Sequence, residues 1–202
     1  GVFFDSPMMS TKDVDILWDI RRKLTLVKDS NSKPDGLLGI IRKAGRSFEA
    51  VRSGDFRAVN RDGYMVDFIK PLPKKIMQKE PVRIGGPGDL EADEIRNLHW
   101  LISSPKFTQI VIGDDGMPAP MIVPDPRAFA LHKFCLSSQD DREPVKKQRD
   151  HDQALSVANL IVKYLPQYKF KANELRMFPK AILTEAEKNI SELELPPGFD
   201  TE

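Results

Sequence analysis

The sequence predicts an α+β protein in two parts, a mixed sheet with flanking helices followed by a helical region. Two observations lead to this prediction. Short β-favouring runs, separated by Gly-containing turns and a Pro-rich loop, fill the chain up to about Val123. After Pro124 the apolar residues follow a helical spacing instead. We therefore expect a sheet-based core over residues 1–123 and a helical subdomain over residues 124–202.

The first part opens with a strand that runs from about Lys12 to Trp18. A helical apolar pattern follows over residues 37–41 and closes near Gly45, as helix ends often do. Three strand candidates, joined by turns that contain Gly, come next at residues 47–51, 56–60 and 64–69. Their short connections predict a meander.

The remaining elements are assigned from the same signals. We predict a loop over residues 72–88, an amphipathic helix over residues 89–101, and two strands over residues 107–112 and 121–123. Asp125 followed by Pro126 is typical of a helix start, and that helix continues to Ser137. A longer helix is predicted from about Pro144 to Tyr164, with an apolar stripe at Ala154, Val157 and Ile161.

Two acids one residue apart, Asp13 and Asp15, stand inside the first strand. Side chains alternate across a strand, so both carboxylates share one face, where their charges repel each other. A third acid, Asp67, lies in the middle of the strand predicted at residues 64–69. Such carboxylates are hard oxygen ligands suited to Mg²⁺, which would remove the repulsion. The alternative is that one face of an edge strand is simply solvated.

The second part places charged residues on largely apolar helix faces. Lys133 lies four residues after Phe129, so its ammonium either reaches water along its stem or binds an anionic partner. Asp150 continues the stripe of Ala154 by one turn, into a region rich in basic residues. It either forms an ion pair with Lys133 or an arginine, tying two helices together, or belongs to a ligand site.

The composition excludes several classes of protein. With 31 basic and 30 acidic residues the net charge is +1, so no global field attracts nucleic acid or an anionic membrane. The single cysteine, Cys135, excludes an intramolecular disulfide and a thiolate metal cage, and it fits a reducing compartment. No apolar run approaches the ~20 residues that span a bilayer. We expect a cytoplasmic protein with no membrane partner.

Taken in order, these residues resemble a bacterial family of nucleotidyltransferase-fold proteins within the DNA polymerase β-like superfamily. The resemblance rests on the acid pair, on the strand around the third acid, and on an ordered helical segment. These read Asp13-Val14-Asp15, Tyr64-Met65-Val66-Asp67-Phe68-Ile69, and Pro124-Asp125-Pro126-Arg127-Ala128-Phe129-Ala130-Leu131-His132-Lys133, with Arg142 and Arg149-Asp150 beyond. It covers nearly the whole chain, from about Thr11 to Pro179.

The resemblance implies metal-dependent transfer of a nucleotidyl group from an NTP to an acceptor. Asp13, Asp15 and Asp67 are then the catalytic residues and hold two Mg²⁺ or Mn²⁺ ions about 3.5 to 4 Å apart. Asp67 also helps to activate the acceptor, as a metal ligand or a base. Lys133 contacts the triphosphate and Asp150 orients it, with further phosphate contacts expected from Arg142, Lys147 and Arg149.

A catalytically inactive nucleotide-binding or regulatory module with the same fold is the competing hypothesis. The sequence does not specify which NTP is used, whether the acceptor is RNA, a protein or a small molecule, or the oligomeric state. Members of the superfamily carry a glycine turn just before the acid-pair strand, and residues 1–10 contain none. We therefore expect this chain to lack an upstream segment, to bind Mg²⁺ weakly, and to show little transfer until that segment is restored.

Overall fold

The computed structural model describes residues 12–21, 36–73, 81–113 and 115–191. The chain divides into two compact units, residues 1–98 and 99–202. The division follows Leu98, whereas the sequence pattern changes at Pro124, so the strands between these two points belong to the second unit. The expectation of a missing upstream turn concerns residues 1–10, which lie outside the described residues.

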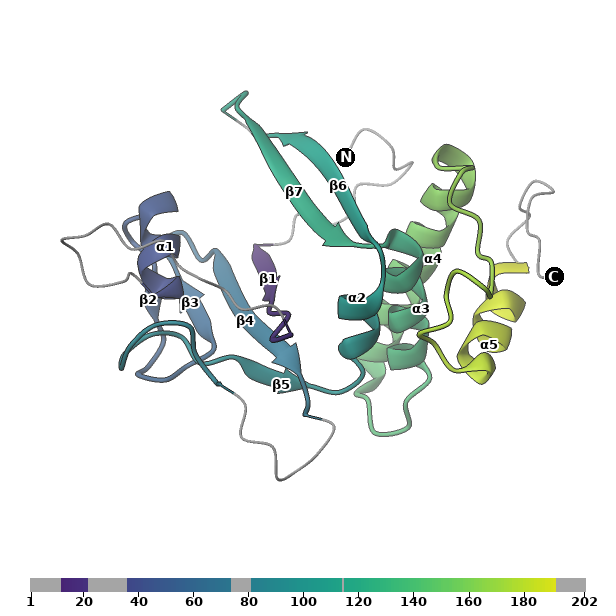
Figure 1. Ribbon diagram of the computed structural model, residues 1–202, viewed down its shortest axis with the longest axis horizontal. Coiled ribbons are helices and arrows are strands. Elements are labelled where there is room, and N and C mark those ends of the chain that lie inside the picture. The colour runs from purple at the N-terminus through teal and green to yellow at the C-terminus, as the bar shows by residue number, and fades with distance from the viewer. Residues whose placement is uncertain (1–11, 22–35, 74–80, 114, 192–202) are drawn as a thin grey trace. The chain divides into compact units, whose positions relative to one another are not determined.

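A five-stranded mixed sheet forms the framework of the first unit (Figure 1). The order is β1-β4-β3-β2, in which β1 is parallel to β4 and β3 is antiparallel to both β4 and β2. β5 pairs in parallel with the end of β4. The bounds are β1 Asp13–Leu17, β2 Glu49–Ala50, β3 Arg57–Val59, β4 Met65–Pro71 and β5 Asp93–Ile95. The predicted α+β class and meander are confirmed, although β2 and β3 are shorter than predicted.

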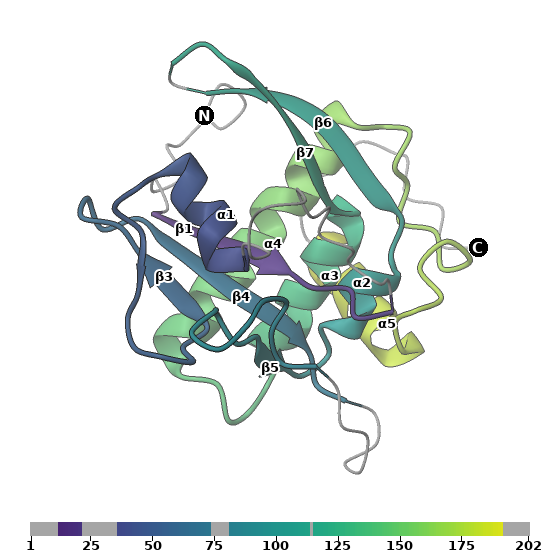
Figure 2. The ribbon, with the colours of Figure 1, turned by 60° about the vertical axis from the view of Figure 1, so that its left-hand side comes forward.

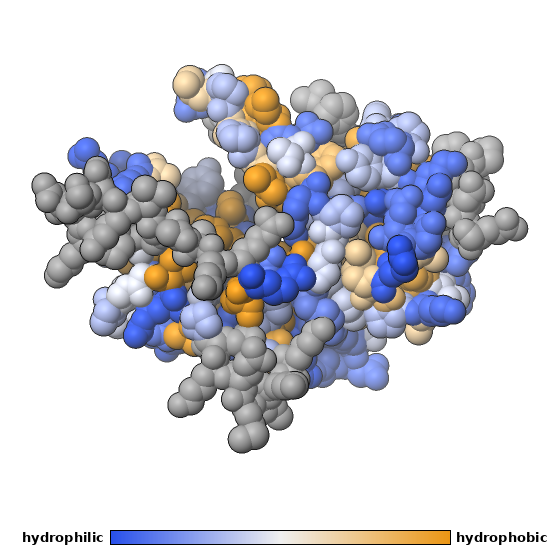
Figure 3. Space-filling model, in the orientation of Figure 1, coloured by the Kyte–Doolittle hydropathy of each residue, from blue (hydrophilic) through white to orange (hydrophobic). Residues whose placement is uncertain are grey.

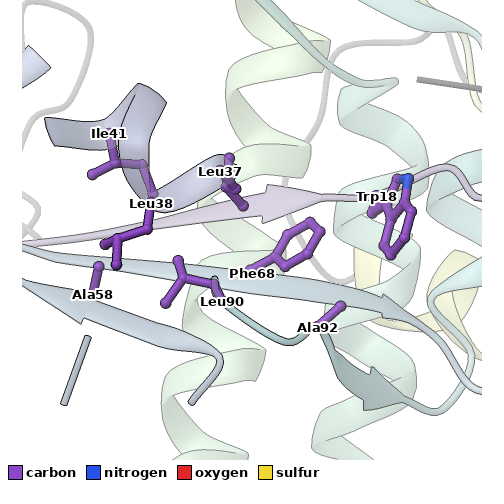
Figure 4. Close-up of a cluster of buried hydrophobic side chains, with 8 residues drawn as sticks. All are labelled: Trp18, Leu37, Leu38, Ile41, Ala58, Phe68, Leu90 and Ala92. Atoms are coloured by element: carbon purple, nitrogen blue, oxygen red, sulfur yellow. The ribbon is translucent and has the colours of Figure 1, made fainter. Parts of the chain in front are cut away.

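Helix α1, Leu37–Ala44, covers one face of this sheet (Figure 4). Its buried Leu37, Leu38 and Ile41 pack in one cluster with Phe68 of β4 and with Trp18, which follows β1. The Trp18 and Phe68 rings stack with their centroids 5.3 Å apart. Because side chains alternate along β1 and β4, the core-facing positions leave the intervening residues on the opposite face of the sheet.

The prediction of a helix over residues 89–101 is wrong. Leu90 and Ala92 are both buried in the core of the first unit, at the two-residue spacing of an extended chain. Asp89 is buried as well, and its carboxylate accepts hydrogen bonds from the N–H groups of Leu37 and Leu38 at 3.0 and 2.8 Å, which caps α1. These tertiary contacts extend the segment into β5, and a helix forms only after Asn97, whose φ is 63°.

The second unit combines a β-hairpin with four helices in its described part (Figures 1 and 2). The elements are α2 His99–Ser103, β6 Lys106–Ile112, β7 Pro118–Pro124, α3 Pro126–Ser137, α4 Pro144–Tyr164 and α5 Lys180–Ser191. The predicted bounds of α4 are confirmed and those of α3 differ by one residue; α5 was not predicted as a separate element. None of the described helices is long and apolar enough to cross a membrane.

Helices α3 and α4 pack directly against each other (Figure 2). Asp125 begins α3 as predicted, because its side chain accepts a hydrogen bond from the Arg127 N–H at 2.8 Å. On α4 the fully buried apolar residues are Ala154, Ala158 and Ile161, so Ala158 takes the core position that the sequence assigned to Val157. Alanines allow the two helix backbones to approach closely.

The β6–β7 hairpin carries exposed apolar side chains (Figure 3). Ile110 and Ile122 are 68% and 71% exposed. A two-stranded hairpin is only marginally stable in water, so its base has to be held by the rest of the unit. The Asp125 N–H donates to the carbonyl of Pro105 at 3.0 Å, and Phe107 packs edge-on against Tyr168.

Candidate functional site

The three predicted site acids lie on the face of the sheet opposite α1, which we call the acid face: Asp13, Asp15 and Asp67. The register pairs Asp15 of β1 with Asp67 of β4, and residues paired in register point to the same side of a sheet. Asp13 stands two residues before Asp15 on that side. Asp13 and Asp15 are exposed, whereas Asp67 is buried. The shared face predicted from strand alternation is confirmed.

Asp67 is bound by an arginine of the neighbouring strand. Arg57 of β3 is paired in register with Asp67, and its guanidinium donates from Nε at 2.7 Å and from Nη2 at 2.5 Å, one bond to each carboxylate oxygen. These hydrogen bonds raise the pKa of Arg57, and the charges of Asp67, Asp13 and Asp55 raise it further against the opposing effect of burial. The guanidinium therefore lies in the field of more than one acid.

Sequence analysis missed Arg57, although a signal for it exists. The turn at Asp62-Gly63 closes the β3–β4 hairpin, and Gly63 has a φ of 79°. Arg57 precedes Asp62 by five residues and Asp67 follows it by five, so a hairpin centred on Asp62 places the two side chains opposite each other. The turn signal alone gives the register only to within one residue, because a two-residue turn at Asp62-Gly63 would set Arg57 opposite Phe68; the odd loop length centred on Asp62 is what pairs Arg57 with Asp67.

The donor chemistry of the acid face fits a hard divalent cation, because its three side chains are carboxylates on one side of adjacent strands. In the described part of the chain, however, no group of three or more His, Cys, Asp or Glu side chains is gathered closely enough to hold a metal ion. Both oxygens of Asp67 bind Arg57 instead. Metal ligation by Asp13, Asp15 and Asp67 stays a prediction.

In the second unit a buried carboxylate binds two cations, and we call this set the basic cluster: Lys133, Arg142 and Asp150. Asp150 is fully buried on α4 and accepts a bond from Lys133 Nζ at 2.8 Å. Its other oxygen accepts from Arg142 Nε at 2.9 Å and Nη2 at 2.6 Å. The ion pair between Asp150 and Lys133, one of the two alternatives that the sequence left open for Asp150, is present and ties α3 to α4.

The local structure explains how these three groups meet. Lys133 lies in the middle of α3, with its ammonium over the Phe129 ring at 5.6 Å, and Arg142 comes from the short connection between α3 and α4. Burial raises the pKa of Asp150, but the hydrogen bonds and charges of Lys133 and Arg142 outweigh it, and the net shift is downward. Asp150 therefore stays ionised, and the cluster carries one excess positive charge.

The other two predicted phosphate contacts do not join this cluster. Among the described residues, the hydrogen bonds to the Asp150 carboxylate come from Lys133 and Arg142. Lys147 is half-buried and Arg149 is exposed on α4. Arg149 directly precedes Asp150, and neighbouring residues of a helix point in different directions. Phosphate contact by Lys147 and Arg149 stays a prediction.

His132 lies beside the basic cluster and is buried. Its ring packs edge-on against Trp100, and in the described part of the chain its Nδ1 has no hydrogen-bond partner. Burial, followed by the charge of Lys133, lowers the pKa of His132 to about 4. His132 is thus neutral near pH 7, and the positive charge of the cluster comes from Lys133 and Arg142.

The comparison with known families agrees with the geometry. The chain belongs to a nucleotidyltransferase family, whose sequence profile matches residues 1–177. This match includes both the acid face and the basic cluster. No curated protein and no solved structure matches the chain. The α+β architecture is accordingly that of a nucleotidyltransferase-like fold.

Proposed function

We propose that this protein transfers a nucleotidyl group from an NTP to an acceptor in a reaction that depends on a divalent metal ion. The observation that carries the proposal is the register of β1 and β4, which sets Asp15 beside Asp67 on the face that α1 does not cover. Carboxylates grouped on one face repel each other without a cation. Membership of the nucleotidyltransferase family supports the same reaction class.

The residues of the acid face have defined tasks in this proposal. Asp13, Asp15 and Asp67 would hold the metal, which when bound neutralises phosphate charge and polarises the α-phosphate. Asp67, as a carboxylate, would also accept the proton of the acceptor hydroxyl. The acceptor oxygen then forms a bond to the α-phosphorus while the bond to the leaving pyrophosphate breaks.

The basic cluster would bind phosphate oxygens. Lys133 and Arg142 share one counter-charge, Asp150, so one positive charge is left over. In the described contacts Lys133 uses one of the three N–H donors of an ammonium. Asp150 fixes the position of both cations, and a preorganised donor pair loses less entropy when it binds an anion. This is the task that we propose for Lys133, Arg142 and Asp150.

The Arg57–Asp67 pair favours a second candidate, a nucleotide-binding or regulatory module that performs no transfer. An acid that is already neutralised by a bidentate arginine is a weaker metal ligand. Such a module would bind nucleotide through the basic cluster but would leave it intact. Binding without turnover therefore separates the two candidates.

The test is a transfer assay of the full-length protein with each α-labelled NTP, Mg²⁺ or Mn²⁺, and RNA, protein and small-molecule fractions of a cell extract. We expect label in one fraction, and a loss of at least about a hundredfold in Asp13→Asn and Asp15→Asn. Asp62→Asn is the matched control, because Asp62 is an exposed carboxylate in the β3–β4 turn of the same sheet. Undiminished labelling by both acid variants would contradict the proposed site, and nucleotide binding without labelling would favour the module.

A further inference from the structure

Arg57 occupies both oxygens of the most buried member of the acid face. Its two bonds to Asp67 form a parallel fork, the geometry in which an arginine binds a carboxylate most strongly. The side chain of Asp67 is 12% exposed and that of Arg57 is 37% exposed. A partly exposed arginine of the neighbouring strand therefore holds both oxygens of a mostly buried acid.

The charges around Arg57 make it more than a partner of one residue. Asp15 stands beside Asp67 in the register, and the charge of Asp13 acts on the guanidinium. The guanidinium thus contributes one positive charge to a face that has three carboxylates. A divalent cation bound to this face would neutralise the same carboxylates.

We propose that Arg57 is an internal counter-ion that competes with the metal ion for Asp67, and that metal binding displaces it. This inference rests on the proposed function, because it assumes that the acid face takes a divalent metal ion. Arg57 and the metal need the same carboxylate oxygens, so the pair lowers the affinity of the nucleotide-free protein for metal. In compensation, Arg57 neutralises part of the negative charge of the acid face when no metal is bound.

The displaced guanidinium has a second use. Arg57 lies on β3 beside the acids, and a guanidinium binds phosphate oxygens with the same fork that it uses for a carboxylate. A nucleotide that arrives with the metal would offer Arg57 a new partner and remove the cost of its release. Metal binding and nucleotide binding would then favour each other.

The test measures Mn²⁺ binding by the loss of the free-ion signal in electron paramagnetic resonance, without nucleotide. We expect Arg57→Met to bind Mn²⁺ about tenfold more tightly than the unmodified protein, because the competitor is gone. Arg52→Met is the matched control. Arg52 is an arginine of the same unit that pairs with Asp55 at 3.1 Å and is 82% exposed, so its loss makes the same change in net charge. Its affinity should stay within about twofold.

Two further variants locate the effect. Adding Asp67→Asn to Arg57→Met should abolish the gain, because it removes the contested ligand. Arg57→Lys keeps the charge but loses the fork, and we expect it to bind Mn²⁺ more tightly than the unmodified protein and less tightly than Arg57→Met. If circular dichroism shows that Arg57→Met does not fold, Arg57→Lys decides the question by the same comparison.

The nucleotide arm tests the coupling. With a non-hydrolysable NTP present, the advantage of Arg57→Met should shrink or reverse, because the nucleotide gives Arg57 another partner. Equal or weaker Mn²⁺ binding by Arg57→Met without nucleotide, or no Mn²⁺ binding by any variant, overturns the inference. Transfer activity is measured separately. A protein that transfers label but shows no gain in Arg57→Met contradicts only this inference, whereas a gain without transfer contradicts only the proposed reaction.

Discussion

The acid face and the basic cluster are built from the same groups in opposite proportions. The acid face has three carboxylates and one guanidinium, which binds Asp67, whereas in the basic cluster two cations bind one carboxylate. The excess charge is negative at the acid face and positive at the basic cluster. A carboxylate-rich site suits a divalent cation, and a site with spare N–H donors suits phosphate. The acid face therefore has the chemistry for a metal ion, and the basic cluster has the chemistry for phosphate.

Burial distinguishes the two sites as clearly as charge does. Asp150 is fully buried with its partners around it, while Asp13 and Asp15 are exposed. Removing a buried charge leaves its partners uncompensated, and removing an exposed carboxylate costs the fold little. The basic cluster should thus contribute to stability and binding together, whereas the exposed Asp13 and Asp15 should contribute to function alone.

The largest stability effect is expected for Asp150→Asn. Asp150 is fully buried, and the change leaves Lys133 and Arg142 without their counter-charge. We expect a loss of about 3 kcal/mol in the free energy of unfolding. This lies at the low end for a buried pair, because both cations are partly exposed. Denaturant titration measures it.

Asp152→Asn is the control for this prediction. Asp152 lies two residues further along α4, and its side chain is 61% exposed, so its removal should change the free energy of unfolding by less than about 0.5 kcal/mol. Equal small losses in both variants would mean that Lys133 and Arg142 do not depend on Asp150. The difference in burial between the two sites would then not translate into a difference in the free energy of unfolding.

A smaller effect is expected from His132 as the pH falls. Its pKa is lowered from 6.5 to about 4 in the folded protein, so between these values the unfolded chain binds more protons. Stability is then fully present above about pH 6.5 and falls as the pH is lowered. From the two pKa values we expect a loss of about 2 kcal/mol between pH 7 and pH 5.

His132→Phe should remove most of this loss, because it keeps a ring against Trp100 and cannot be protonated. Denaturant titrations at pH 7 and pH 5 measure the difference, with His151→Gln as a control at a partly exposed position of α4. An unchanged pH dependence in His132→Phe would show that His132 is not the titrating group. The conclusion that His132 is neutral beside the basic cluster would then have no support.

The parts that sequence analysis predicted depend on local patterns. Alternation along a strand places Asp13 and Asp15 on one face, and a helix start at Asp125-Pro126 needs only its own residues. The pairing of Lys133 with Asp150 was within reach, because an acid and a lysine on apolar helix faces need partners. Each of these inferences uses a rule that operates within a few residues.

The parts that it missed depend on distant contacts. Asp89 caps α1 by accepting a hydrogen bond from the N–H of Leu37, which lies 52 residues earlier in the chain. This contact overrides the helical pattern of the segment that contains Asp89. Arg57 becomes important only through its register with Asp67. Neither effect follows from composition or periodicity, because the partner lies on another element.

The smallest effect, and the sharpest test of the comparison, is expected for Lys133→Met. Arg142 still binds Asp150 in this variant, so the fold should persist. If the basic cluster binds distal phosphates, affinity for a non-hydrolysable NTP should fall about tenfold while affinity for the monophosphate changes much less. Calorimetric titration measures both, with Lys180→Met as a control at an exposed lysine of α5. A purely structural pair predicts lower thermal stability without nucleotide and no selective change in affinity. That result would leave the basic cluster as a clamp between α3 and α4, and only the acid face would retain a proposed role in the reaction.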